Sequence, residues 1–317
     1  MALHNIGKIL LPSEDIGHSD IMLGILLAFG SAIAFSFNAI IIRRGVLRAS
    51  SNYIANISIL TGPVFSLFVA IVSGAIYHIG QFPWKAGVFM ALSGIIHFAF
   101  GRTFAYRSIQ LIGANRANIV TSLSPIVSVT LAIIVLGERV NALMMLGILC
   151  SLSSPFITLL KEQTVARGSQ IRGSFQDKDV DQQTLYLGML YGAGAALFWG
   201  SSFIFIKLGL ASGGTPIVGN LLAYVGASIA IIPSLLKREN KREMLIADRK
   251  SLQLGLLVGL TSNIAQLLRY LALEYGSVIV VTAVIRTSPL GTLLLSFILI
   301  RQYESFSRWV LLSNALL

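Results

Sequence analysis

Two segments of this chain repeat one pattern, and that pattern decides the fold. They read LGILLAFGSAIAFSFNAIIIRRG at residues 23–45 and LGMLYGAGAALFWGSSFIFIKLG at residues 187–209. The two align without a gap, at an offset of 164 residues (187 minus 23). Each is an apolar run of about 20 residues, the length that an α-helix needs to cross a bilayer. We therefore expect two equivalent transmembrane helices.

The same offset recurs further along the chain. Tyr106 corresponds to Tyr270, and the Ser-Pro dipeptide at 124–125 corresponds to the one at 288–289. Chance seldom preserves one register over so much sequence, so a duplication is the better explanation. Internal duplication of this kind is frequent in membrane transport folds.

The composition excludes an ordinary soluble domain. Hydrophobic residues make up 55% of the 317 residues and charged residues 12%, where a soluble domain carries about 25% charged residues. The mean hydropathy is +0.79. The net charge of +11 lies mostly at the ends of apolar runs, which indicates membrane topology and contact with anionic lipids rather than nucleic-acid binding.

A hydropathy window of about 19 residues gives ten spans in two groups of five. They cover 21–42, 53–76, 86–106, 117–136 and 142–160, then 185–206, 217–236, 252–273, 278–300 and a short last run from 309. The chain thus divides into an N-terminal segment (1–20), a first repeat (21–160), a polar linker (161–184) and a second repeat (185–317). Because five is odd, the second repeat must enter the membrane in the opposite sense. The expected fold is an all-α membrane protein of about ten transmembrane helices in two inverted five-helix repeats, with a shortened last helix.

The distribution of basic residues predicts the orientation. Connections after the odd-numbered spans hold seventeen lysines and arginines, whereas the opposite side holds four, namely Lys8, Lys85, Arg139 and Lys207. Basic residues are enriched in cytoplasmic loops. This bias predicts that both termini lie outside a plasma membrane. The first twenty residues lack the pattern of a cleavable signal peptide, so the first span is expected to direct its own insertion.

Two prolines lie inside predicted spans at equivalent positions of the repeats. Pro125 and Pro289 each remove a backbone hydrogen bond and free the carbonyl four residues earlier. A kink that merely packs is one interpretation. The other is a hinge, or a discontinuous helix that lines a binding cavity at the middle of the membrane.

Arg286 is the charge placed deepest in a predicted span, three residues before Pro289. Arg102 and Arg269 lie closer to span ends, where their side chains are expected to reach the interface. A buried arginine in a membrane costs several kcal/mol unless it faces water, a partner or a ligand. We therefore expect Arg286 to bind an anionic group of a substrate.

Other polar residues at membrane depth complete the predicted cavity. No aspartate lies inside a span, and Glu138, Glu274 and Glu304 fall at span ends. Without an embedded carboxylate, neutral, zwitterionic or anionic solutes such as amino acids are favoured over lipophilic cations. His97 is either a proton relay or a structural hydrogen-bonding group. The predicted substrate-binding residues are Asn38, His97, Asn118, Thr121, Ser202, Gln266 and Arg286.

Two other function classes fit the sequence less well. An intramembrane enzyme needs convergent catalytic groups, but the lone Cys150 and the single histidine within a span supply none. A receptor or scaffold should have longer loops than 161–184 and 237–251. There is no phosphate-binding glycine loop, so we expect no cofactor. Energy should come from a coupling proton or from exchange against a counter-substrate.

The sequence resembles the drug/metabolite transporter superfamily, specifically an EamA-type permease with two EamA repeats. The resemblance covers the chain from about residue 23 onward and rests on the glycine-rich opening helix, on Lys207-Leu208-Gly209, on the Ser-Pro kinks and on Leu136-Gly137-Glu138. It implies a carrier that exports or exchanges metabolites by alternating access, with its site between the two halves.

The chain departs from that family's pattern in the second repeat. Glu304 corresponds to Glu138 only with a two-residue insertion, and the final helix is about half the usual length. Family members are commonly drawn with cytoplasmic termini, whereas the charge distribution here predicts external ones.

Overall fold

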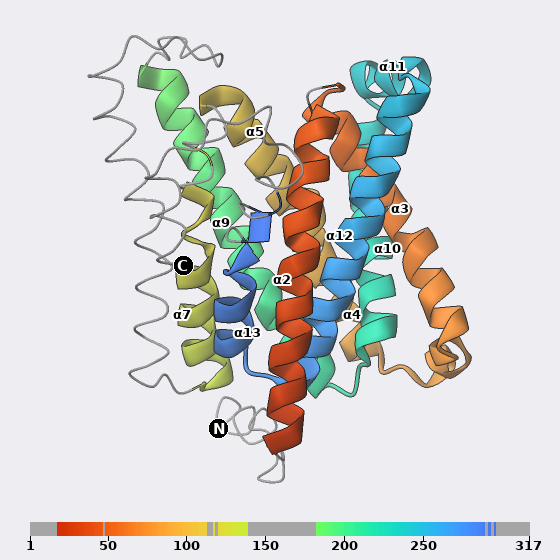
Figure 1. Cartoon of the computed structure of the whole chain (residues 1–317), viewed down its shortest axis with the longest axis vertical. Coiled ribbons are helices and arrows are strands. Elements are labelled where there is room, and N and C mark those ends of the chain that lie inside the picture. Colours follow the sequence, from red (N-terminus) through yellow and green to blue (C-terminus); the bar gives the residue numbers. More distant parts are fainter. Residues whose placement is uncertain are drawn as a thin grey trace.

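The computed structural model describes residues 18–46, 48–112, 117, 120–138, 182–288, 291, 292 and 295. The described elements form a helical bundle without strands (Figure 1). Those of the first repeat are α2 (His18–Val46), α3 (Ser51–Val72), the 3₁₀ helix η1 (Ala75–Gln81), α4 (Trp84–Gly94), the π-helix η2 (Ile95–Gly101), α5 (Arg102–Ile112) and α7 (Ser124–Leu136). Those of the second are α9 (Gln182–Ala211), α10 (Pro216–Leu235), α11 (Arg238–Ile246), α12 (Arg249–Tyr275) and α13 (Val278–Ile285).

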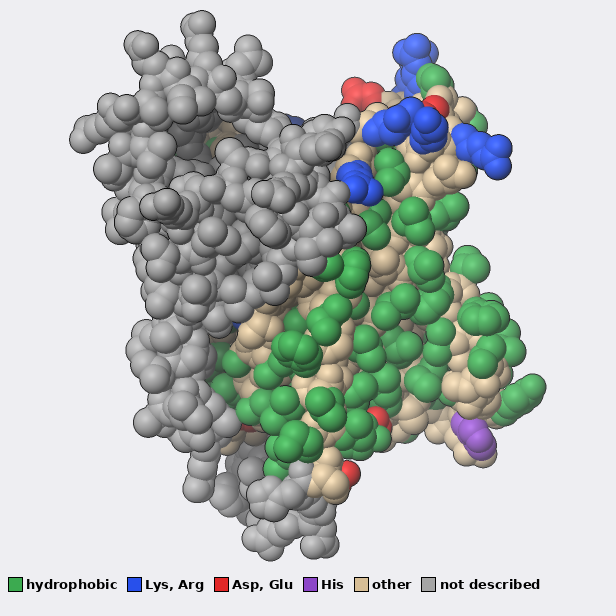
Figure 2. All heavy atoms as spheres, in the orientation of Figure 1, with side chains coloured by type: hydrophobic (Ala, Val, Ile, Leu, Met, Phe, Trp, Pro, Cys, Tyr) green, Lys and Arg blue, Asp and Glu red, His purple; other side chains and the backbone are tan. Residues whose placement is uncertain are grey.

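Six segments of the described chain are long and apolar enough to cross a membrane. They are Ser19–Ile42, Ser51–Val72, Trp84–Ser108, Gln182–Ala211, Pro216–Leu235 and Arg249–Tyr275. Large apolar side chains such as Phe68 and Ile134 are more than 60% exposed on the surface of the bundle, and Figure 2 shows a broad band of such groups. In a bilayer these side chains face lipid. The predicted spans 142–160 and from 309 onward lie outside the described residues.

Local chemistry explains two differences from the predicted spans. The second span was expected to reach residue 76, but α3 ends at Val72 because Gly74 adopts a left-handed conformation (φ 76°), which commonly ends a helix. The third predicted span continues through the π-helical segment η2 into α5. Its helical path is therefore longer than the prediction.

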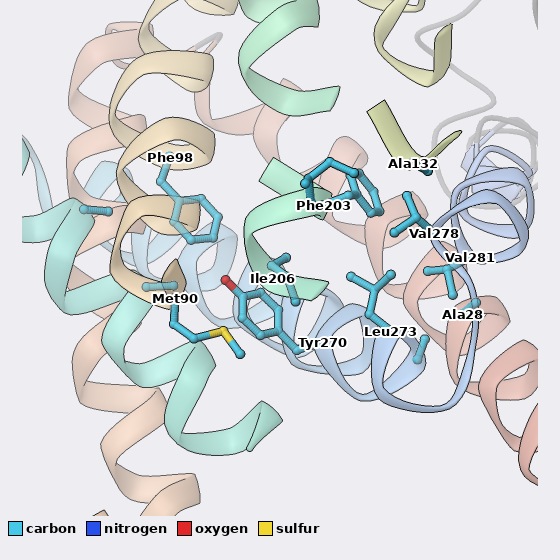
Figure 3. Packing of buried hydrophobic residues seen from close by; sticks show 14 of the residues in the cluster. Ala28, Met90, Phe98, Ala132, Phe203, Ile206, Tyr270, Leu273, Val278 and Val281 are labelled. Atoms are coloured by element: carbon cyan, nitrogen blue, oxygen red, sulfur yellow. The ribbon is translucent and has the colours of Figure 1, made fainter. Parts of the chain in front are cut away.

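Small residues let the helices approach closely at the centre. A β-carbon on Gly94 would lie 1.9 Å from the backbone oxygen of Ala223, so α4 and α10 touch through their backbones there. Close approach through small residues is the usual way that membrane helices associate. The core beside this crossing contains Met90, Phe98 and Tyr270, which are fully buried (Figure 3).

The two repeats are related in space as well as in sequence. Figure 1 shows α2 and α9 running in opposite directions, which an inverted arrangement requires. Some contacts between the repeats occur twice, at positions that differ by the offset of 164 residues. The Ser36 hydroxyl donates to the Ser288 backbone oxygen at 2.7 Å, and at the equivalent pair a β-carbon on Gly200 would lie 2.6 Å from the Ser124 backbone oxygen.

Both helices that carry a Ser-Pro dipeptide are interrupted at equivalent positions. In the first repeat, residues 122–123 form a turn and α7 starts at Ser124, with Pro125 in its first turn. In the second, α13 ends at Ile285 and residues 286–287 form the turn. A proline is compatible with the first turn of a helix but not with its interior. The structure thus has an interruption just before Pro125. The hinge role of Pro125 stays a prediction, and Pro289 itself lies outside the described residues.

Glu138, at the end of α7, binds the start of α13. Its carboxylate accepts hydrogen bonds from the backbone nitrogens of Val278 (2.7 Å) and Ile279 (3.1 Å). The ammonium of Lys207 donates to the backbone oxygens of Leu273 (2.6 Å) and Gly276 (2.8 Å) at the end of α12. A carboxylate at a helix N-terminus and a cation at a C-terminus both stabilise the helix dipole. The Leu-Gly-Glu and Lys-Leu-Gly motifs thus fix the connection between α12 and α13.

Candidate substrate site

His97 lies in the π-helix η2 and faces the second repeat. Its Nδ1 atom is 2.9 Å from the hydroxyl of Ser202 on α9, and its Nε2 atom is 3.1 Å from Nε2 of Gln266 on α12. The indole of Trp199 donates to the His97 backbone oxygen at 3.2 Å. π-Helical turns are rare and are frequent at functional sites. This one places an imidazole at the meeting point of three elements.

Arg269 of α12 contacts the same histidine. Its Nη1 atom lies 3.4 Å from His97 Nδ1, and the residue is only 2% exposed. The centre of the guanidinium lies 4.7 Å from the ring of Phe203, within the range of a cation–π interaction. Its Nε and Nη2 atoms have no hydrogen-bond partner among the described residues. A buried guanidinium thus presents two nitrogen atoms without an acceptor beside His97.

The donors around His97 define its hydrogen bonding. The Ser202 hydroxyl donates to the Trp199 backbone oxygen at 2.8 Å, so its oxygen can accept from Nδ1 of the imidazole. Nε2 then accepts from the amide nitrogen of Gln266. Among the described residues, the Nε and Nη2 atoms of Arg269 remain as donors without a partner, which suits an anionic ligand.

Arg286 lies at the second helix interruption and reaches the first. Its Nη2 atom donates to the hydroxyl of Ser124, and its side chain is part-buried. The residues at both interruptions therefore meet in one place. Thr121 is buried, three residues before Ser124.

Asn38 is not part of the His97 cluster. Its side-chain oxygen accepts a hydrogen bond from Thr261 at 2.9 Å. Thr261 lies eight residues before Arg269 on α12, about 12 Å along the helix. The offset of 164 maps Asn38 onto Ser202 and Thr261 onto His97, so these two contacts are equivalent between the repeats. In the second contact a histidine stands where the first has a threonine.

The structure thus brings some of the predicted site residues together and separates others. His97 contacts both Ser202 and Gln266. Arg286 connects the two helix interruptions through Ser124, and Asn38 bonds Thr261 outside the His97 cluster. Asn118 lies outside the described residues. In the described part of the chain, no group of three or more histidine, cysteine or acidic residues could hold a metal.

The expectation that Arg102 and Arg269 extend toward the membrane surface is wrong. Arg269 turns inward to His97, and Arg102 donates to the hydroxyls of Ser58 and Ser262. Distance from the span end alone does not reveal that Arg269 is buried. The signal that identifies it is helical spacing, because residues 262, 266 and 269 are polar and share one face of α12.

Comparison with known proteins decides the family. The model of the EamA-like transporter family matches residues 22–160 and 186–317. The chain belongs to the EamA-like transporter family. This family is part of the drug/metabolite transporter superfamily, so the protein is a multi-pass membrane protein that transports small molecules.

A solved structure has the same fold. It is titled "Crystal structure of protein", and it superposes with a TM-score of 0.67 at 17% identity, over 92% of this chain and 93% of that chain. At that identity the likeness concerns the fold alone. No curated protein matches the sequence.

Proposed function

We propose that this EamA-like protein is a secondary transporter that exports or exchanges small metabolites with a carboxylate group, either anionic or zwitterionic, such as amino acids. The observation that carries the proposal is that two nitrogens of the buried Arg269 guanidinium, Nε and Nη2, have no hydrogen-bond partner among the described residues. Leaving a buried charged donor unpaired is costly. A substrate carboxylate would satisfy both groups in the geometry that arginine prefers.

The predicted role of Arg286 fits the same substrate class. Arg286 belongs to the turn that interrupts one span and bonds Ser124 at the turn that interrupts another. Interrupted helices are suited to alternating access because their two halves can move separately. In this proposal Arg286 exchanges its bond with Ser124 for one with the substrate as the two repeats rock. Transport draws its energy from a proton gradient or a counter-substrate.

The proposed orientation follows from charge. The basic residues of α11 and its neighbours lie at one end of the bundle (Figure 2). By the positive-inside rule, this end of the protein faces the cytoplasm when the protein lies in the plasma membrane. Both termini then face outside.

The test compares transport by Arg286→Ala and Arg286→Lys with that of the unmodified protein in proteoliposomes. Removing one charged hydrogen bond costs about 1.5–3 kcal/mol, or roughly 10- to 100-fold in affinity. Arg286→Ala should therefore abolish flux at low substrate concentration while the protein still inserts and elutes as a single species. The control is Lys85→Ala, which removes an exposed cation at the start of α4. Unchanged flux in Arg286→Ala would exclude this role for Arg286.

A further inference from the structure

The short helix α11 connects α10 and α12 and attaches to the bundle through one face. The amide of Asn240 donates to the Ser234 backbone oxygen at 2.8 Å, and the carboxylate of Glu243 accepts from the Ser50 hydroxyl at 2.6 Å. Met244 packs against the small apolar cluster that contains Tyr53. Positions 240, 243 and 244 have helical spacing, so this face is fixed to the protein.

The opposite face of α11 combines basic and apolar side chains. Arg238, Lys241, Arg242, Leu245 and Ile246 line one shallow hollow. Their spacing of three and four residues places them along a single stripe of the helix. Leu245 is 78% exposed and Ile246 is 66% exposed. We call these five residues the α11 face.

Among the described residues, the three cations of the α11 face have no acidic partner. Within the described parts of the chain, the ion pair that forms is Arg48 with Asp248. Glu243 is engaged by Ser50, and Glu239 makes no ion pair there. Figure 2 shows the Lys and Arg side chains of this end as a cluster directly above the apolar band. The cluster therefore offers unpaired positive charge at the level where the spans α10 and α12 leave the apolar region.

We propose that the α11 face is a binding site for the headgroup of an anionic phospholipid. Arg238, Lys241 and Arg242 would bind the phosphate, and Leu245 and Ile246 would lie among the upper acyl carbons. A free phosphate in solution would gain nothing from two exposed apolar side chains, whereas a lipid at the interface contacts both. The site is separate from the His97 and Arg286 region and does not depend on the proposed function.

The experiment measures bound lipid by native mass spectrometry of the full chain in detergent, titrated with phosphatidylglycerol or phosphatidylcholine. One variant carries Arg238→Gln, Lys241→Gln and Arg242→Gln. Its matched control carries Lys237→Gln, Arg249→Gln and Lys250→Gln, which removes the same charge from the same end but outside the α11 face. Thermal unfolding of each variant checks that it is folded.

We expect the unmodified protein and the control variant to prefer phosphatidylglycerol, and the α11-face variant to lose that preference by about tenfold or more. A second variant, Leu245→Ser with Ile246→Ser, should weaken phosphatidylglycerol binding. Equal loss in both charge variants would show diffuse attraction and overturn the proposal. So would competition by inorganic phosphate at concentrations similar to those of the lipid, because that result would indicate a soluble anion instead.

Discussion

The guanidinium of Arg269 carries its charge within the packed interior, and its neighbours offset only part of the cost of burying that charge. Its Nη1 atom lies 3.4 Å from Nδ1 of His97, and the ring of Phe203 lies 4.7 Å from its centre. A desolvated cation–π contact is worth about 2 kcal/mol, which is less than the several kcal/mol that burial of the charge costs. This imbalance supports the proposed role of Arg269 in binding a substrate.

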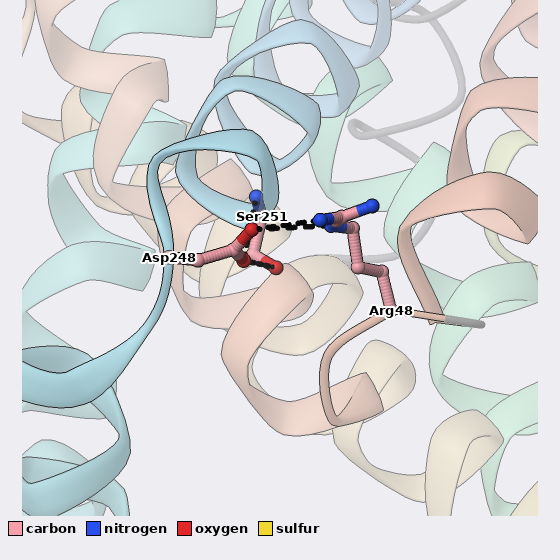
Figure 4. Close-up of polar contacts among 3 residues, drawn as sticks. All are labelled: Arg48, Asp248 and Ser251. Carbon is pink, nitrogen blue, oxygen red and sulfur yellow. Dashed lines mark hydrogen bonds and ion pairs between the residues drawn. The ribbon is translucent and has the colours of Figure 1, made fainter.

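The carboxylate of Asp248 lies outside the spans, where its contribution to stability can be tested through its pH dependence (Figure 4). Its carboxylate caps the start of α12 by accepting from the backbone nitrogen of Ser251 at 3.2 Å, and it pairs with Arg48 at 3.0 Å. Hydrogen bonds from the Ser251 side chain and from Arg48 lower the pKa of Asp248 from 3.8 to about 2. A lowered pKa stabilises the fold above about pH 4, and that contribution is lost as the pH falls toward 2.

Asp248→Asn should therefore lower the thermal unfolding temperature at pH 7. The difference from the unmodified protein should shrink between about pH 4 and pH 2, as the wild-type carboxylate becomes protonated. The measurement is thermal unfolding in detergent at a series of pH values. Asp20→Asn serves as a control at the other end of the bundle. A difference that stays constant down to pH 2 would show that the carboxylate is not stabilised in its charged form.

At the level of residues, the sequence predicted the types of polar group better than their partners. The offset of 164 paired Asn38 with Ser202, but it could not show that one bonds Thr261 and the other His97, because those contacts join different repeats. Arg269 was missed for the same reason. Its partner lies in the first repeat, 172 residues away.

At the scale of elements, α4 contains a matched pair of glycines that tests helix packing. A β-carbon on Gly94 would lie 1.9 Å from the backbone oxygen of Ala223, whereas one on Gly87 would have its nearest neighbour, Leu222 Cδ1, at 3.7 Å. Gly94→Ala should cost about 1–3 kcal/mol of stability by overpacking, because a backbone atom cannot move aside as a side chain can.

Gly87→Ala is the control, and it should leave stability unchanged or raise it slightly, since alanine favours helix over glycine by about 1 kcal/mol. Thermal unfolding of both variants in one detergent provides the comparison. Equal unfolding temperatures for the two variants would show that α4 and α10 do not touch at Gly94.

Element positions could be predicted where a long apolar run determined them. The cores of α2, α10 and α12 agree with their predicted spans within a few residues, and Pro125 correctly indicated the interruption before α7. The π-helix η2 has no comparable signal in one sequence. Within it, the backbone oxygen of His97 accepts a hydrogen bond from the Trp199 indole, a contact between the repeats that one sequence does not reveal.

At the scale of the whole molecule, the two repeats give a symmetric frame in which one half has become specialised. Equivalent contacts are made by Asn38 with Thr261 and by Ser202 with His97, and in the second the histidine also contacts Arg269. The offset maps Arg269 onto Ala105. The duplication therefore supplies the framework, and residues that differ between the copies supply the candidate site.

The most direct test of the central claim is flux through proteoliposomes. A panel of labelled amino acids, organic anions and cationic dyes is offered to the unmodified protein and to Arg269→Gln, with and without an imposed proton gradient. We predict accelerated flux of an anionic or zwitterionic solute, lost in Arg269→Gln although that variant inserts and elutes like the unmodified protein. Flux of cationic dyes alone, or equal flux through both proteins, would contradict the account.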